Sequence, residues 1–379
     1  MRKFRFVALA VLVAALSAIA ASAASASPGI VGEVYVNDNT AGANTVAGYY
    51  RHSDGTLTAI PGSPFVAGGA GTGHADASQG SLQLSPDGHY LLAVDAGSNQ
   101  ISVLRINPDG SLRPADGGPV SSNGGNPVSI AISNDLVYVA NADPTAPNYT
   151  GFRLGFGGHL YPIPGSTVSL PAGSQPGDVL FSGDGRRVVG TRVGTSLIDS
   201  FLVGFDGRLH AAQGSPFSAQ GLGPFGSEFN PVNPFQLFVS NAHGGAGNGT
   251  VSAFIDGFAG DLTSIGSSPF PDLQTAPCWV EISRNGRYLF AVNTAVATIS
   301  SYSINWNGSL SLLGSTALKA PAGGPEDARL SPDGTTLWVV DSGTDAISGF
   351  SVNGGTLSEL PSSPIAGPAG ATPSGIVVT

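Results

Sequence analysis

The chain has little of what disulfide-stabilised, metal-binding or nucleic-acid-binding proteins need. Its only cysteine, Cys278, excludes an intramolecular disulfide, and we expect this thiol to be buried as a small apolar side chain. Lys and Arg number 15 against 25 Asp and Glu, so nucleic acid is not an expected partner. The chain has no His-Glu-x-x-His segment and no Cys-x-x-Cys pair, and we expect neither a metal nor a cofactor.

Long helical patterns are also missing, apart from the N-terminal region. No later stretch has the 3.6-residue apolar spacing of an amphipathic helix. Residues 1–26 resemble a secretory signal peptide: Arg2, Lys3 and Arg5 precede an apolar run over 6–20, and Ala-x-Ala cleavage sites follow. The run is too short for a membrane anchor, so we expect no membrane span in the mature chain. The predicted location is secreted, extracellular or associated with the cell envelope.

The most informative positive feature is a turn that recurs seven times. It has the form (Asp/Asn/Gly/Ala)-Gly-x-Leu, and successive copies lie 47 to 55 residues apart, ending at Leu57, Leu112, Leu160, Leu209, Leu262, Leu310 and Leu357. Repeats of this length, built from short strands, become stable when neighbouring units stack around an axis. We therefore predict an all-β, seven-bladed β-propeller of four-stranded antiparallel blades, in one domain over residues 30–379, and a monomer.

Each repeat reads as four strands separated by turn residues. In residues 79–112, apolar or alternating runs are interrupted by Ser-Pro-Asp-Gly, by residues 95–99 and by Pro-Asp-Gly. The second strand is almost continuously apolar, as in residues 137–141 and 289–293, which suits a strand covered on both faces. Ser-Pro-Phe recurs at the end of the predicted outer strand, where an edge tolerates proline.

The first repeat opens directly on its second strand and lacks an inner strand. Residues 372–379, Thr-Pro-Ser-Gly-Ile-Val-Val-Thr, match the inner-strand pattern of the other repeats. We therefore predict that the C-terminal strand pairs with the first repeat and closes the ring, which removes both open edges.

The Ser-Pro-Asp-Gly turns, Tyr-Val-x-Asn second strands and x-Asp-Gly-x-Leu outer turns resemble the lactonase-like propeller family. That family includes bacterial 6-phosphogluconolactonases and fungal carboxymuconate cyclases, and it is related to the Tyr-Val-Thr-Asn (YVTN) repeat surface-layer propellers. The resemblance covers the mature chain and implies lactone hydrolysis or cycloisomerisation as candidate activities. In the family's enzymes a Gly-Pro-Arg-His segment is associated with the active site. The matching segment here is Gly223-Pro224-Phe225-Gly226, which has neither the Arg nor the His.

Candidate site residues come from aligning the inner strands on their first proline. The fifth position is charged in three consecutive repeats, at Glu228, Glu281 and Arg329, and Asp178 and Asp327 lie two residues nearer the top, the end where inner strands begin. Converging buried carboxylates need counter-ions or raised pKa values. The cluster is therefore either a structural ion network between blades or a polar pocket. The predicted ligand-binding residues are Asp178, Glu228, Trp279, Glu281, Asp327, Arg329 and His243.

Two functions follow from these residues. The first is a non-catalytic module that binds a small molecule, a glycan or a cell-surface protein at its top face. The second is a lactone hydrolase or cycloisomerase with a carboxylate as general base, for which the catalytic candidates are Glu228, Glu281, Arg329 and His74. Because Phe225 and Gly226 replace the family's Arg and His, and because a phosphorylated sugar lactone is a cytoplasmic metabolite, we favour the binding module.

Overall fold

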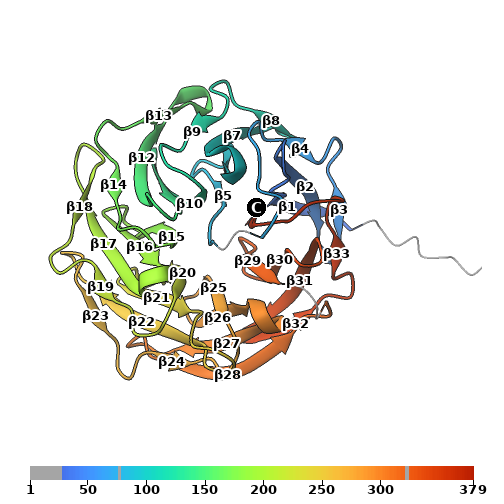
Figure 1. The fold of residues 1–379 in the computed structure, drawn as a ribbon. Coiled ribbons are helices and arrows are strands. Elements are labelled where there is room, and N and C mark those ends of the chain that lie inside the picture. The colour runs from blue at the N-terminus through green and yellow to red at the C-terminus, as the bar shows by residue number, and fades with distance from the viewer. Residues whose placement is uncertain (1–27, 76–77, 321–323) are drawn as a thin grey trace, which may run out of the picture.

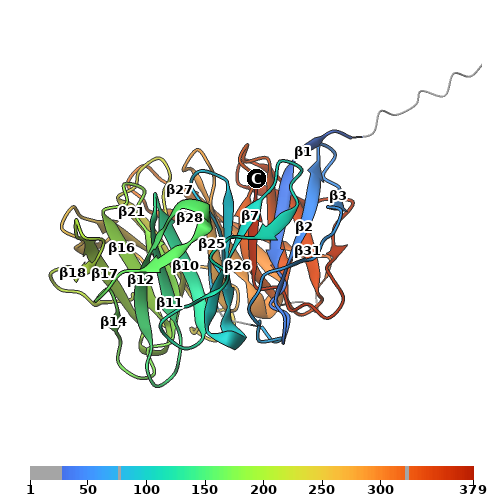
Figure 2. The ribbon, with the colours of Figure 1, turned by 90° about the horizontal axis from the view of Figure 1, so that it is seen from above.

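The structure, a computed structural model, describes residues 28–75, 78–320 and 324–379, so the predicted signal peptide lies outside it. In these residues seven antiparallel sheets are arranged around a central axis (Figure 1), which confirms the predicted propeller. Figure 2 shows from the side that the inner strands cross the thickness of the ring. Both the turn after the inner strand and the turn after the third strand therefore lie on one face, called the bottom here.

The strands fall into equivalent positions of the seven blades. The inner strands are β34 (Gly375–Val378), β5 (Leu82–Leu84), β10 (Pro127–Ser133), β15 (Pro176–Phe181), β20 (Pro224–Phe229), β25 (Pro277–Ile282) and β29 (Pro325–Leu330). The second strands are β1 (Ile30–Asn37), β6 (Tyr90–Asp95), β11 (Leu136–Asn141), β16 (Arg187–Arg192), β21 (Gln236–Asn241), β26 (Tyr288–Asn293) and β30 (Thr336–Asp341). The third strands are β2 (Thr45–His52), β7 (Gln100–Ile106), β12 (Asn148–Leu154), β17 (Leu197–Val203), β22 (Thr250–Asp256), β27 (Thr298–Ile304) and β31 (Ala346–Asn353).

The outer positions and the short helices complete the described elements. The outer strands begin with β3 (Leu57–Ala59), β8 (Leu112–Pro114), β13 (Leu160–Pro162), β18 (Leu209–Ala211), β23 (Leu262–Ser264), β28 (Leu310–Ala317) and β32 (Thr356–Glu359). A second outer piece is formed by β4 (Phe65–Val66), β9 (Val120–Ser121), β14 (Val168–Ser169), β19 (Phe217–Ser218), β24 (Phe270–Pro271) and β33 (Ile365–Ala366). Single 3-10 turns occur at η1 (Ala96–Ser98), η2 (Phe156–Gly158), η3 (Val193–Thr195) and η4 (Thr294–Val296).

The motif residues of the second strands build blades and link them. The hydroxyl of Tyr138 in β11 donates to the carbonyl of Gly207, 2.8 Å away in the outer turn of the next blade. At the end of the same strand, the Asn141 amide donates to Asn148 Oδ1 at 2.9 Å in β12. Gly207 has a φ of +82°, a backbone conformation that is strained for any residue with a side chain. Tyr-Val-x-Asn and x-Gly-x-Leu are thus structural signals in this chain.

The outer strand differs from the prediction because it is divided in six of the seven blades. In blade one, β3 and β4 both pair with β2, and the residues between them leave the ladder. There the Ser63 hydroxyl accepts the Gly48 N–H at 2.9 Å and replaces the missing backbone acceptor. The equivalent bond from Ser200 to Ser215 is 3.0 Å. In blades one, four and five Ser-Pro therefore interrupts the outer strand, and the following Phe begins its second piece.

The C-terminal strand closes the ring as predicted. β34 pairs antiparallel with β1 from Val34↔Val378 to Asn37↔Gly375. The Thr379 N–H donates to the Glu33 carbonyl at 2.9 Å, beyond the ladder proper. The first blade is therefore assembled from both ends of the described chain.

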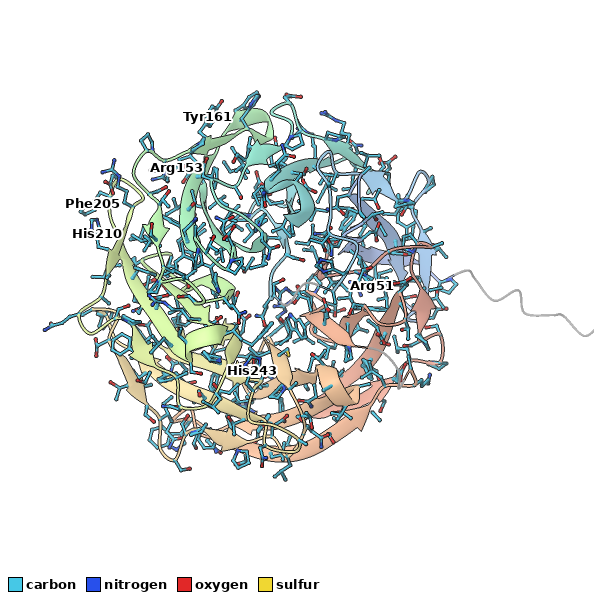
Figure 3. The ribbon with its side chains drawn as sticks, in the orientation of Figure 1. Arg51, Arg153, Tyr161, Phe205, His210 and His243 are labelled. Carbon is cyan, nitrogen blue, oxygen red and sulfur yellow. The ribbon has the colours of Figure 1, made fainter. Side chains whose placement is uncertain are left out.

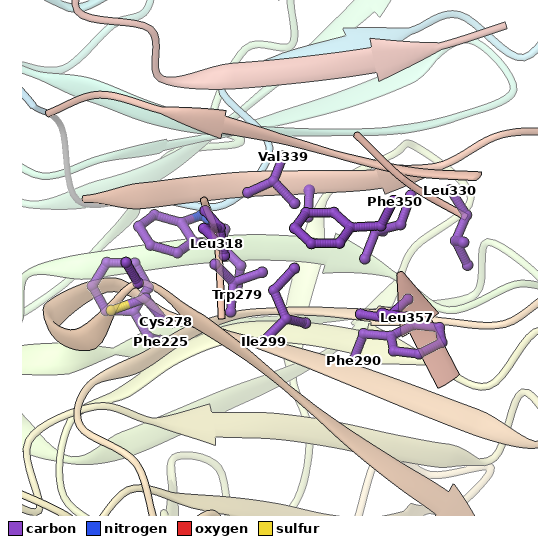
Figure 4. Close-up of a cluster of buried hydrophobic side chains, with 14 of the residues drawn as sticks. Phe225, Cys278, Trp279, Phe290, Ile299, Leu318, Leu330, Val339, Phe350 and Leu357 are labelled. Atoms are coloured by element: carbon purple, nitrogen blue, oxygen red, sulfur yellow. The ribbon is translucent and has the colours of Figure 1, made fainter. Parts of the chain in front are cut away.

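Each junction between neighbouring blades holds a cluster of buried apolar side chains. The cluster between blades six and seven contains Trp279, Phe290 and Phe350, each at most 2% exposed (Figure 4). Fully burying one such side chain contributes roughly 1.5–3 kcal/mol. Cys278 lies in the same cluster, which confirms its predicted burial, and desolvation raises the pKa of its thiol to about 12. Among the described residues, no helix has the length and apolarity to cross a membrane.

Candidate functional site

Charged side chains of blades four to seven meet at the propeller axis, as the alignment of inner strands predicted. Arg329 Nη1 of β29 lies 3.3 Å from Glu281 Oε2 of β25 and 3.5 Å from Asp327 Oδ1. The second oxygen of Glu281 accepts the Leu330 N–H at 3.0 Å. Arg329 therefore joins two blades through carboxylates that are almost fully buried. Burial raises the pKa of Asp327, although the charge of Arg329 opposes this.

Glu228, in β20, is the member of this cluster that has no hydrogen bond or ion pair with the described residues. Burial, followed by the negative charge of Glu281, raises the pKa of its carboxyl to about 8 even though Arg329 acts in the opposite direction. Asp178 in β15 is held differently, because it accepts the Ser227 N–H at 2.9 Å and the Ser129 hydroxyl at 3.2 Å. Its pKa is raised by burial to about 6.

A segment between blades one and two crosses the axis above these charges. Gln79 Nε2 donates to the Ser227 carbonyl at 2.8 Å, and Gln79 Oε1 accepts the Val280 N–H at 3.1 Å. The Trp279 indole N–H donates to the Ser78 carbonyl. We call residues 78–79 the axial segment. A Cβ on Gly226 would lie 2.1 Å from Gln79 Oε1, so glycine is needed at this crossing.

The axial segment separates the charged level from the top face. Gln79 contacts the fourth residue of β20 and of β25, whereas Glu228 and Glu281 are the fifth residues. Trp279, one of the predicted ligand-binding residues, is 2% exposed, and its indole N–H donates to the Ser78 carbonyl of this segment. Ser78 and Gln79 were not predicted as site residues, because residue 79 was assigned to the first strand of its repeat, whereas β5 begins only at Leu82.

A cavity of about 250 Å³ opens on the top face between blades three, four and five. It is lined by Asn126, Val128, Ala142, Gln175, Pro176, Val193, Phe225 and His243. His243 is exposed and follows β21 by two residues; Figure 3 shows it nearer the axis than Phe205 and His210, which lie on the outer rim. Of the predicted site residues, His243 alone lines this cavity. Phe225, which also lines it, occupies the motif position at which the family's enzymes have Arg.

The remaining candidate, His74, lies in the exposed loop that leads to the axial segment. Its carbonyl accepts the Asn39 amide at 2.8 Å, and its ring Nδ1 is 3.3 Å from the Ala75 carbonyl. His74 is not among the residues that line the top-face cavity. Asn126 and Gln175, which do line it, were not predicted. Both residues have a positive φ, and each directly precedes the first proline of an inner strand. Their position before that proline is the sequence signal that could have predicted them as lining residues.

Comparison with known proteins places this geometry in a family. A model described as "Lactonase, 7-bladed beta-propeller" matches residues 42–154 and 229–375, which is more than half of the chain. The protein therefore belongs to the lactonase family of seven-bladed β-propellers. The interval between the two matched segments, residues 155–228, contains blade four and the Phe225 segment. A comparison with curated proteins gives no match.

Solved structures show the same fold at low sequence identity. A putative 6-phosphogluconolactonase from Bacteroides uniformis is 20% identical, with a TM-score of 0.73 and coverage of 92% of this chain and 99% of that one. The Pseudomonas aeruginosa periplasmic gluconolactonase PpgL is 16% identical, with the same TM-score and the same coverage. A streptogramin B lyase is 15% identical, with a TM-score of 0.54 over 79% of this chain and 87% of that one. At these identities the likeness concerns the fold.

Proposed function

We propose that the protein is an exported propeller that binds a small uncharged molecule in the top-face cavity. The observation that carries this proposal is the composition of the cavity wall. Its eight lining residues include no Asp, Glu, Lys or Arg, and His243 is their only titratable side chain. Apolar walls with a few polar groups are typical of small-molecule sites. The Asn126 and Gln175 amides, with His243, offer hydrogen bonds to hydroxyl or carbonyl groups.

A phosphorylated sugar lactone fits this cavity poorly. A phosphate group calls for Arg, Lys or several backbone donors, and the wall has Phe225 where the family resemblance implies Arg. The charged cluster at the axis does not supply the missing groups, because Arg329 is already paired with Glu281 and Asp327 and lies beyond the axial segment. We therefore expect turnover of 6-phosphogluconolactone to stay below about 1 s⁻¹, the lower end of ordinary enzyme rates.

Hydrolysis of an uncharged lactone is the second candidate, supported by the family membership and by His243. A neutral imidazole can accept a proton from the attacking water, and amide N–H groups can hold the carbonyl oxygen as charge develops on it. The periplasmic gluconolactonase among the structural neighbours carries an exported location and a lactonase activity in its name, so the two properties are compatible in this fold.

One set of measurements tests both candidates. The mature protein, His243→Ala and the control His210→Ala are mixed with δ-gluconolactone and with 6-phosphogluconolactone. Binding in the cavity raises the melting temperature of the wild type and of His210→Ala with δ-gluconolactone, and the shift is lost in His243→Ala. Steady hydrolysis that disappears only in His243→Ala selects the second candidate. A melting shift that His243→Ala leaves unchanged, or rapid turnover of the phosphorylated lactone, contradicts the proposed site.

A further inference from the structure

Four neighbouring blades present an exposed aromatic side chain at the same turn position on the bottom face. The position lies four residues before the leucine of the recurring turn, and it holds Phe156, Phe205, Phe258 and Trp306 in blades three to six. Trp306 is 93% exposed, and Phe258, the least exposed of the four, is 83% exposed. Such side chains contribute little to folding, so their recurrence on one face indicates an interaction surface.

Trp306 lies beside a cavity of about 380 Å³ between the bottom turns of blades five and six, called the Trp306 cavity here. The turn between β20 and β21 contributes Val232 and Asn233, and the turn between β25 and β26 contributes Asn285 and Arg287. Gln236 Nε2 donates to the Trp306 carbonyl at 3.3 Å and ties the aromatic turn to the neighbouring blade. This hydrogen bond fixes the backbone of the turn that carries Trp306.

The polar groups around the Trp306 cavity are suited to hydroxyl groups. The twelve lining residues include five side-chain amides and no Asp or Glu. Asn285 Oδ1 accepts the Ser283 hydroxyl and the Arg287 N–H, but its Nδ2 has no partner among the described residues. The Arg287 guanidinium and the Tyr288 hydroxyl are likewise without a partner there. Several donors are thus available beside an exposed indole.

We propose that the Trp306 cavity binds a sugar ring of a glycan. A pyranose ring has an apolar C–H face that packs on an indole, while its equatorial hydroxyls form hydrogen bonds with amide, phenol and guanidinium groups. Arg287, with no carboxylate in the lining, also allows a sugar acid, whereas a cationic ligand would find no counter-ion. The exposed phenylalanines in blades three to five place further apolar side chains on the same face, as an extended glycan requires.

Tryptophan fluorescence reports on this site selectively. Of the three tryptophans of the chain, Trp279 and Trp338 are 2% and 0% exposed, so an added ligand changes mainly the emission of Trp306. The mature protein is titrated to about 10 mM with three probes: a β-1,4-linked glucose oligosaccharide, a β-1,4-linked N-acetylglucosamine oligosaccharide and an oligogalacturonate. We expect saturable binding of at least one probe.

Point variants and calorimetric titration locate the binding. Calorimetric titration shows at least about a tenfold loss of affinity in Trp306→Ala. Tyr161→Ala, which removes a 56% exposed aromatic side chain of β13 outside the proposed surface, retains wild-type affinity. If the preferred ligand is a sugar acid, Arg287→Ala weakens the binding of oligogalacturonate more than that of the neutral probes. If the preferred ligand is neutral, the variant weakens the binding of all three probes similarly. Absence of saturable binding to all three probes, or equal binding by Trp306→Ala, overturns the proposal.

Discussion

At the scale of single residues, the axis combines a tightly paired Arg329 with an unpaired Glu228. Arg329 is the cation beside Glu281 and Asp327, and it also lowers the pKa of Glu228 against the effect of burial. Breaking a buried ion pair by removing one partner leaves an uncompensated charge. Mutation of Arg329 can distinguish a role of these charges in stability from a role in ligand binding.

Arg329→Ala should destabilise the fold by about 3–5 kcal/mol at pH 7, because the carboxylates of Glu281 and Asp327 lose their counter-ion in a buried setting. The loss should shrink at pH 5, because burial raises the pKa of Asp327 and the variant lacks the Arg329 charge that opposes this rise. Urea unfolding of both proteins at the two pH values measures the effect.

The matched control is Arg153→Ala, which removes the exposed pair with Asp135, whose N–O distance is 2.8 Å. Surface pairs contribute about 0–1 kcal/mol, so this variant should stay close to the wild type at both pH values. If Arg329→Ala costs less than about 1 kcal/mol at pH 7, the ion pairs are not structural and a ligand-binding role for the cluster gains support.

At the scale of elements, β34 is the strand on which closure of the ring depends. It pairs with β1, and its residues Ile376 and Val377 are buried against neighbouring blades. Arg51 Nη2 also donates to the Thr379 carbonyl at 3.1 Å. Removal of β34 would leave the inner edge of β1 unpaired and expose two interfaces.

A truncation ending at Pro368 should therefore lower the melting temperature of the whole propeller. The lost contacts include Ile376, at 0% exposure, and replacing a buried Ile by Ala alone costs about 2–5 kcal/mol. Calorimetry of the truncated and full-length mature proteins measures the change. A variant truncated by Thr379 alone serves as the control for the terminus. Cooperative melting of the Pro368 truncation at the wild-type temperature would rule out this role of β34.

The sequence was sufficient for the elements that recur and insufficient for those that occur once. The blades and their closure were predicted from the seven Leu turns, the apolar second strands and residues 372–379. These patterns recur because each blade packs against its neighbours in the same way. The outer strands are divided where hydroxyls such as that of Ser63 accept a backbone N–H, and the recurrence of Ser-Pro-Phe in the sequence does not reveal this contact. Gln79 crosses the axis through contacts about 150 and 200 residues away in sequence, and the cavity at Phe225 and His243 combines loops of three blades.

At the scale of the whole molecule, carboxyl groups fall into two populations with opposite behaviour. Burial raises the pKa of interior groups, to about 6 for Asp178 and Asp256, about 7 for Asp38 and about 8 for Glu228. Aspartates of exposed turns are different, because hydrogen bonds from neighbouring hydroxyls and N–H groups lower their pKa values. These aspartates include Asp54, Asp109, Asp143 and Asp333.

These two populations predict a stability maximum at mildly acid pH. Buried groups with raised pKa values bind protons in the native state that the unfolded chain releases near pH 4, so stability decreases as pH rises from about 4.5 to 8. The turn aspartates stabilise the native state above their ordinary pKa of 3.8, and that contribution is lost as pH falls toward 2. One unit of pKa difference corresponds to about 1.4 kcal/mol, so we expect at least about 2 kcal/mol less stability at pH 8 than at pH 5.

Urea unfolding at intervals between pH 3 and pH 8.5 tests this expectation, with Glu228→Gln as the matched variant. The Gln side chain cannot ionise, so the variant should equal the wild type near pH 4.5 and exceed its stability at pH 8, which flattens the alkaline side of the profile. Asp135→Asn, at an exposed carboxyl, should leave that slope unchanged. Wild-type stability that rises from pH 5 to pH 8, or an unaltered slope in Glu228→Gln, would show that the axial carboxyl is ionised in the folded protein at neutral pH and that solvent reaches the charged level of the axis.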